Sequence, residues 1–158
     1  MYSIMLSRSI VFGLLLAFLL MVFSASSCDS YKTGTDYRTI AWNDALDAGI
    51  SPQYFVNQIN IESGFNPSAY SSEGAQGIAQ FMPRTASGLG IDPWEPIQSL
   101  RGAAQLMSRY VAKYGTFRHA LAAYNCGSGC LNWAIRNCLD FYWCIPYQTR
   151  HYIDIIMV

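Results

Sequence analysis

The segment from Pro96 to Gly115 carries the pattern that most limits how this chain can fold. Its apolar residues recur at spacings of three and four, which places them along one face of an α-helix. Proline near its start and glycine at its end are typical helix boundaries. An apolar stripe of this kind is the core-facing side of a helix rather than a ligand surface. The stripe comprises Ile97, Leu100, Ala104, Met107, Val111 and Tyr114.

From Thr39 onward, the rest of the chain carries residues typical of the starts and ends of short helices. Ser51 and Pro52 suit the cap and first position of a helix, and Gly64 suits its end. Alternating apolar runs typical of strands are not found. The sequence therefore predicts a compact, mainly α domain over residues 39–158. Its helices are expected at residues 43–48 (as part of a first helix), 52–63, 75–82, 96–114, 117–125 and 148–156, with a further turn beginning at Pro83.

The N-terminus is different in character. After Arg8, residues 10–23 are continuously apolar, and the small-residue sequence SASSC follows them. This order is typical of a secretory signal. The run is short of the ~20 residues of a spanning helix, but it is long enough for an uncleaved anchor to remain an alternative. We expect a signal peptide or membrane anchor in residues 1–28, a short polar tether in residues 29–38, and an exported protein.

Cysteine usage also favours export. Four cysteines near the C-terminus suit two disulfides, with three possible pairings left open. A zinc site fits less well, because the spacing is not that of two C-x-x-C pairs. These four residues are Cys126, Cys130, Cys138 and Cys144.

Cys28 stands apart from that group and directly follows the apolar run. Its position resembles the lipid-acceptor cysteine of bacterial lipoproteins, although Ala25 occupies a place where leucine is usual. An unpaired cysteine just beyond an ordinary signal is the alternative.

Composition narrows the function classes. The chain of 158 residues is 52% apolar, which suits one domain with a sizeable core, and its formal net charge is zero. Such a balance gives no electrostatic basis for binding nucleic acid. His119 and His151 lie outside any motif, so we expect neither a metal site nor a cofactor.

Glu62 is the carboxylate that best suits chemistry. Phe55, Ile59 and Glu62 are spaced by four and three, so they share one apolar helix face. Glu62 also falls in the last helical turn, where the helix dipole disfavours negative charge. Both effects raise the pKa, and a neutral carboxyl group is what a general acid requires. The alternative is an ordinary glutamate at a helix end, facing solvent.

Three ordered segments then resemble the soluble lytic transglycosylase family, the lysozyme-like enzymes that cleave bacterial peptidoglycan. Residues 62–86 read ESGFNPSAYSSEGAQGIAQFMPRTA, residues 120–129 read ALAAYNCGSG, and residues 145–156 read IPYQTRHYIDII. The resemblance extends over residues 46–157. It departs from the family pattern at Gln148, where glutamate is usual.

The resemblance implies a lysozyme-like catalytic domain over residues 39–158. It also implies cleavage of the β-1,4 bond between N-acetylmuramic acid and N-acetylglucosamine. In this family the muramyl 6-hydroxyl attacks its own C1, so a 1,6-anhydro sugar forms without water. A second carboxylate is unnecessary because the nucleophile belongs to the substrate. Glu62 is expected to act first as acid and then as base.

The resemblance also assigns supporting roles. Tyr124 is expected to hydrogen-bond near Glu62, and Gln80 and Asn125 are expected to bind sugar hydroxyl or acetamido groups. Gly74 and Gly77 are expected to allow close backbone packing beside the cleft. The full expected set of substrate-binding or supporting residues is Ser63, Ser71, Gln80, Met82, Tyr124, Asn125 and Gln148.

Two other functions remain open from the sequence. One is a hydrolytic muramidase like the goose-type lysozymes, and the other is a non-catalytic domain that binds glycan or braces an envelope or virion assembly. The expected partner is the peptidoglycan glycan strand, met by a monomeric domain in the periplasm or envelope, with membrane attachment through the N-terminus if that segment is kept as an anchor or lipidated. Wall remodelling, secretion, conjugation and phage assembly are all compatible settings, the last with virion association.

Overall fold

The computed structural model describes residues 34–158. A compact unit spans Asp36–Val158. The expected signal or anchor, the lipid-acceptor role of Cys28 and residues 29–33 of the expected tether lie outside the described residues. The helices are α2 (Tyr37–Asp47), α3 (Pro52–Ser63), α4 (Pro83–Leu89), α5 (Pro96–Tyr114), α6 (Phe117–Asn125), α7 (Gly127–Asn137), the 3₁₀ helix η1 (Phe141–Cys144) and α8 (Tyr147–Ile156).

Helix α3 has the boundaries that the sequence predicts. The Ser51 hydroxyl accepts a hydrogen bond from the Tyr54 amide at 3.4 Å, and Pro52 occupies the first turn. Gly64 ends the helix with a φ of 63°, a left-handed conformation that glycine adopts without steric cost. These local signals fix the position of Glu62 one residue before the end of the helix.

Helix α5 confirms most of the predicted stripe. Leu100, Ala104 and Met107 are completely buried, and Val111 packs against the core. Ile97, in the first turn, is 47% exposed, so the core-facing stripe begins one turn later than predicted.

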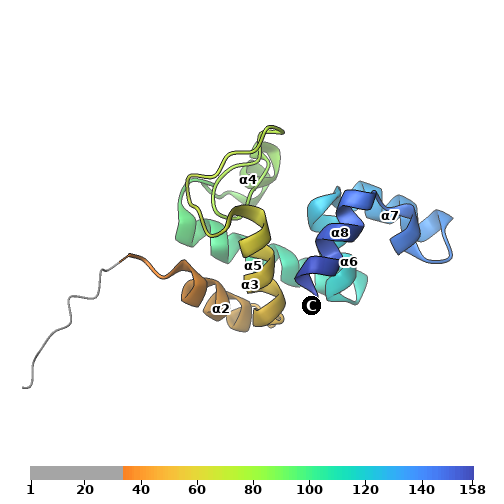
Figure 1. Ribbon diagram of the computed structural model, residues 1–158, viewed down its shortest axis with the longest axis horizontal. Coiled ribbons are helices and arrows are strands. Elements are labelled where there is room, and N and C mark those ends of the chain that lie inside the picture. The colour runs from red at the N-terminus through yellow and green to blue at the C-terminus, as the bar shows by residue number, and fades with distance from the viewer. Residues whose placement is uncertain (1–33) are drawn as a thin grey trace, which may run out of the picture. The chain divides into compact units, whose positions relative to one another are not determined.

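The predicted helix over residues 75–82 is wrong. This stretch forms turns with two isolated bridges, Tyr70 to Gln76 and Gln76 to Phe81. Gly77 and Gln80 have φ values of 71° and 51°, which a right-handed helix cannot contain. Residues 64–82 are therefore a folded loop beside α4, as Figure 1 shows.

The start of α2 and the presence of α7 also differ from prediction. Residues 37 and 38 of the predicted tether belong to α2, because the Asp36 carboxylate accepts from the Thr39 amide at 3.2 Å and caps the helix. Helix α7 was not predicted, because its residues 127 and 129 are glycines, which have a low helix propensity.

Contacts between helices bring distant segments together (Figure 1). Helix α5 contacts α2 and α6, helix α6 contacts α7 and α8, and α3 contacts α2 and α8. The Asn57 side chain donates to the Ile156 carbonyl at 2.9 Å, which fastens α3 to α8. As a result, α3, α6 and α8 present side chains to a common region.

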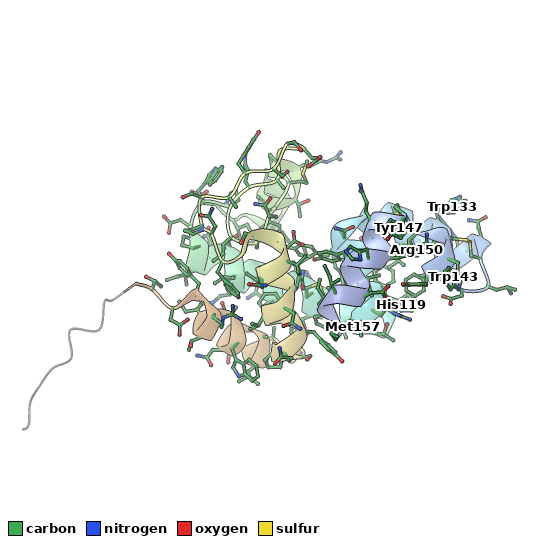
Figure 2. All side chains as sticks on the ribbon, in the orientation of Figure 1. His119, Trp133, Trp143, Tyr147, Arg150 and Met157 are labelled. Atoms are coloured by element: carbon green, nitrogen blue, oxygen red, sulfur yellow. A yellow bond between two sulfur atoms is a disulfide. The ribbon has the colours of Figure 1, made fainter. Side chains whose placement is uncertain are left out.

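The C-terminal segment is held by two disulfides, Cys126–Cys130 and Cys138–Cys144. Figure 2 labels Trp143, Tyr147 and Arg150 near them, and the Arg150 guanidinium lies 5.5 Å and 5.7 Å from the two ring centroids. In residues 34–158 no helix is long and apolar enough to cross a membrane. No group of three or more potential metal ligands was found in the same range.

Candidate active site

Glu62 is held on the apolar face that the sequence predicts. Phe55 and Ile59, on the preceding turns of α3, are completely buried, and Glu62 itself is partly buried. Burial raises the pKa of Glu62 from its ordinary value of 4.5 to about 7, while a hydrogen bond from Tyr152 acts in the opposite direction. No other carboxylate of the described residues contributes to this pKa shift. A substantial fraction of Glu62 is therefore protonated at neutral pH.

Tyr152 is the partner of Glu62 that sequence reasoning missed. Its hydroxyl, on α8, donates to Glu62 Oε1 at 2.5 Å, and the residue is only 6% exposed. The closing motif contains this tyrosine, so a signal was present, but nothing in the sequence placed α8 against α3.

Tyr124 does not make the hydrogen bond that was expected. Its hydroxyl donates to the Ala79 carbonyl at 2.7 Å, because α6 faces the loop that precedes α4. Tyr124 is nevertheless close to Glu62. Burial, followed by the charge of Glu62, raises the pKa of the Tyr124 phenol well above its usual value.

A pocket of about 360 Å³ adjoins Tyr124. This volume is within the usual range for small-molecule sites. Four of the expected substrate-binding residues line the pocket, whereas Glu62 does not. These four are Gln80, Met82, Tyr124 and Asn125. Tyr124 both lines the pocket and lies close to Glu62.

Gln80 braces the loop as well as lining the pocket. Its Nε2 donates to the carbonyls of Ala69 at 3.2 Å and Gly77 at 2.8 Å, so its side-chain oxygen is the group left for a ligand. At Gly77 an added Cβ would lie 1.8 Å from the Pro93 carbonyl oxygen. This close approach agrees with the backbone packing that we expected of Gly77.

The two serines of the expected set hold the same loop. Ser63 donates its hydroxyl hydrogen to the Ile78 carbonyl at 2.6 Å, and Ser71 accepts from the Ala75 amide at 3.0 Å. Both contacts are internal, so these serines position the loop. Ser63 thereby ties the end of α3 to the chain segment that carries Gln80.

Asn125 is oriented by a residue that the sequence did not single out. The buried Thr149 donates its hydroxyl hydrogen to Asn125 Oδ1 at 2.8 Å, which leaves the Asn125 amide group as a donor at the pocket. Gln148 precedes Thr149 and is exposed in the first turn of α8. Met82 is 45% exposed and lines the pocket rather than the core.

Comparison with known proteins agrees with this arrangement. The family described as Transglycosylase SLT domain matches residues 41–140. A transglycosylase of Enterobacteria phage PRD1 is 34% identical over 88 residues, covering 55% of this chain and 33% of the phage protein. Membrane-bound lytic murein transglycosylase F of Yersinia enterocolitica is 38% identical over 76 residues, covering 43% of this chain and 16% of that protein. The chain thus spans a third or less of these two relatives.

Two solved structures share the fold. The lytic transglycosylase Slt of Pseudomonas aeruginosa, solved as an inactive mutant, matches with a TM-score of 0.68 at 22% identity, covering 90% of this chain and 28% of that one. The 70 kDa soluble lytic transglycosylase SLT70 of Escherichia coli matches with a TM-score of 0.64 at 23% identity, covering 77% of this chain and 23% of that one. Since the family match covers most of the compact unit that contains Glu62, the chain belongs to the transglycosylase SLT domain family.

Proposed function

We propose that this protein is a peptidoglycan lytic transglycosylase in which Glu62 is the only catalytic carboxylate. The observation that carries this proposal is a partly buried glutamate with a pKa of about 7, hydrogen-bonded by Tyr152 and close to Tyr124. Tyr124 in turn lines a pocket together with the amide side chains of Gln80 and Asn125. The bond cleaved is the β-1,4 linkage between N-acetylmuramic acid and N-acetylglucosamine. Family membership supports this substrate class.

In the first step, neutral Glu62 donates its proton to the glycosidic oxygen. The bond between that oxygen and C1 of the muramyl residue breaks, and its electron pair goes to the departing sugar. Positive charge then develops at C1. The raised pKa favours this step, because a substantial fraction of Glu62 still carries its proton at neutral pH and can act as the acid.

In the second step, the Glu62 carboxylate takes the proton of the muramyl 6-hydroxyl. The hydroxyl oxygen bonds to C1 and closes the 1,6-anhydro ring, so Glu62 regains the proton that it gave up. The attack is intramolecular, and its effective concentration is correspondingly high. One carboxyl group therefore suffices in this mechanism, because the nucleophile belongs to the substrate.

The residues around Glu62 have separate roles in this proposal. Tyr152 orients the carboxyl group, Asn125 offers donors to the sugar, and Gln80 offers an acceptor. Met82 supplies an apolar contact at the pocket. The protein would act in the cell envelope after export, on glycan strands of the wall.

Mass spectrometry of the products from purified peptidoglycan tests the proposal. Wild-type protein should release anhydro-muropeptides, each one water lighter than its hydrolysed counterpart. Glu62→Gln should release none, whereas Glu73→Gln, at an exposed turn, should behave as wild type. Hydrolysed products would instead indicate a muramidase, and intact glycan with wild-type protein would indicate a binding domain.

A further inference from the structure

Gln58 is a buried polar residue to which the proposed reaction gives no role. It lies on α3, four residues before Glu62, so the two side chains share one face of the helix. It is completely buried. Neither its Oε1 nor its Nε2 has a hydrogen-bond partner of standard geometry among the described residues. A buried amide left in this state is unfavourable, and such groups call for an explanation.

The Tyr152 hydroxyl is a polar group close enough to Gln58 for the two to interact. Burial is the main cause that raises the pKa of the Tyr152 phenol, followed by the charge of Glu62 and the hydrogen bond to it, whereas the Gln58 side chain lowers that pKa. A neighbour lowers the pKa of a phenol by stabilising negative charge on its oxygen. In an amide, the group that does so is the N–H donor.

Hydrogen bonds fix the position of α8 against α3 on either side of Gln58 and Tyr152. Asn57, the residue before Gln58, donates to the Ile156 carbonyl and holds α8 against α3 at this level. Tyr152 itself is 6% exposed and already donates its single proton to Glu62 Oε1. Its oxygen can still accept a hydrogen bond, and Gln58 Nε2 is a donor in need of an acceptor.

We propose that Gln58 is a positioning residue that donates from Nε2 to the Tyr152 hydroxyl oxygen and so commits the phenol proton to Glu62. This inference rests on the proposed function, because it concerns the same carboxyl group. The three side chains form a directional relay: the amide donates to the phenol, and the phenol donates to the carboxyl group.

The relay decides which oxygen of Glu62 carries the acid proton. Because Oε1 accepts from Tyr152, the proton of the neutral acid resides on Oε2, which is free to face the substrate. Without the Gln58 donor, the phenol oxygen can accept a hydrogen bond from the carboxylic acid. The acid proton would then turn inward to Tyr152 and away from the glycosidic oxygen.

The other titratable groups around the relay are few. Tyr124 on α6 interacts with both Glu62 and Tyr152, and Tyr110 on α5 interacts with Tyr124. Burial raises the pKa of the Tyr124 and Tyr152 phenols above the usual value, so both remain neutral near pH 7. In the wild type and in Gln58→Met, changes in the pH profile between pH 5 and pH 9 are therefore assigned to Glu62.

Gln58→Met separates positioning from simple packing, because it keeps the volume and removes the amide. Replacing a buried amide that lacks good hydrogen bonds with an apolar group of similar shape should leave the melting temperature unchanged or raise it. The kcat on purified peptidoglycan should nevertheless fall about tenfold, as expected for one lost hydrogen bond, with KM unchanged. Gln105→Met is the matched control, since Gln105 is exposed on α5 and should show neither effect.

Gln58→Glu keeps the shape and can donate only while its own carboxyl group is protonated. Its kcat should fall more steeply with rising pH than that of the wild type. This variant also decides the question if Gln58→Met fails to fold.

A carboxyl-carbon NMR titration of Glu62 completes the test without requiring turnover. Removal of the amide weakens the donation from Tyr152, so the pKa of Glu62 should rise in Gln58→Met. An unchanged Glu62 titration together with unchanged kcat would overturn the proposal. If the wild type formed no anhydro product, the proposed function would fail, while the titration would still decide the Gln58 relay.

Discussion

The Tyr152 hydroxyl and Glu62 Oε1 are 2.5 Å apart, although 90 residues separate them in sequence. Burial raises the pKa of Glu62, and the hydrogen bond from Tyr152 lowers it. In the proposed mechanism, the resulting value of about 7 lets the same group hold a proton before bond cleavage and accept one afterwards. The contact between α3 and α8 is therefore what adjusts this side chain for both steps.

Tyr152→Phe removes the hydrogen bond and leaves the burial in place. The pKa of Glu62 should rise above about 7, because the cause that lowers it is lost. The alkaline limb of the kcat profile should therefore move to higher pH. At pH 7, kcat should fall about tenfold, because the carboxyl group is no longer oriented by the hydrogen bond. A pH–rate series checks both effects. Tyr147→Phe, at an exposed site on the same helix, should leave the profile unchanged.

Glu62→Gln should stabilise the fold at alkaline pH. The folded-state pKa of about 7 exceeds the ordinary value of 4.5, so ionised Glu62 opposes folding above pH 7, and this opposition disappears below pH 4.5. The shift corresponds to at most about 3 kcal/mol. Denaturation at pH 8 and pH 5 should show a gain from Glu62→Gln that is larger at pH 8. Equal gains at both values, or a gain from Glu73→Gln, would contradict this origin.

Gly77→Ala should strongly destabilise the domain. The new methyl group would lie 1.8 Å from the Pro93 carbonyl oxygen, and the backbone is already at a φ of 71°. A loss of more than about 3 kcal/mol in the free energy of unfolding is expected. Gly64→Ala has a similar φ of 63° with no atom within 4 Å, so it should cost only about 1 kcal/mol. Urea denaturation of the two variants separates the steric clash from the backbone strain.

The disulfide pairing can be checked with trypsin alone. Cleavage after Arg118, Arg136 and Arg150 places Cys126 and Cys130 in one peptide and the other two cysteines in the next. With the pairing in the structure, the unreduced digest should contain two separate peptides, each two hydrogens lighter than its reduced form. A single mass joining residues 119–136 to residues 137–150 would show a different pairing.

Local sequence signals were sufficient where each helix has its own caps. Ser51, Pro52 and Gly64 define α3, and Thr116 caps α6 by accepting from the His119 amide. At residues 75–82, by contrast, the local sequence led to a wrong prediction, because its apolar residues suggested a helix. There the backbone conformations of Gly77 and Gln80 and the contact with Pro93 decide the structure, and these depend on tertiary packing.

The candidate site divides in the same way. Glu62 could be predicted because a helix face and a motif both point to it. Thr149, Tyr152 and Gln58 could not be assigned, because their roles depend on how α8 lies against α3 and α6. Side-chain partners that meet across separate helices leave no periodic trace in the chain.

Because Glu62 and Tyr152 are 90 residues apart in sequence, the hydrogen bond between them forms only when α8 packs against α3 as the domain assembles. Until α8 docks, Glu62 lacks both its cover and its hydroxyl partner, and it titrates as an ordinary solvated carboxylate. A molecule in which α8 has not docked, or has opened again, therefore has Glu62 without its raised pKa. In the proposed mechanism, cleavage of peptidoglycan would then be confined to molecules that have completed folding.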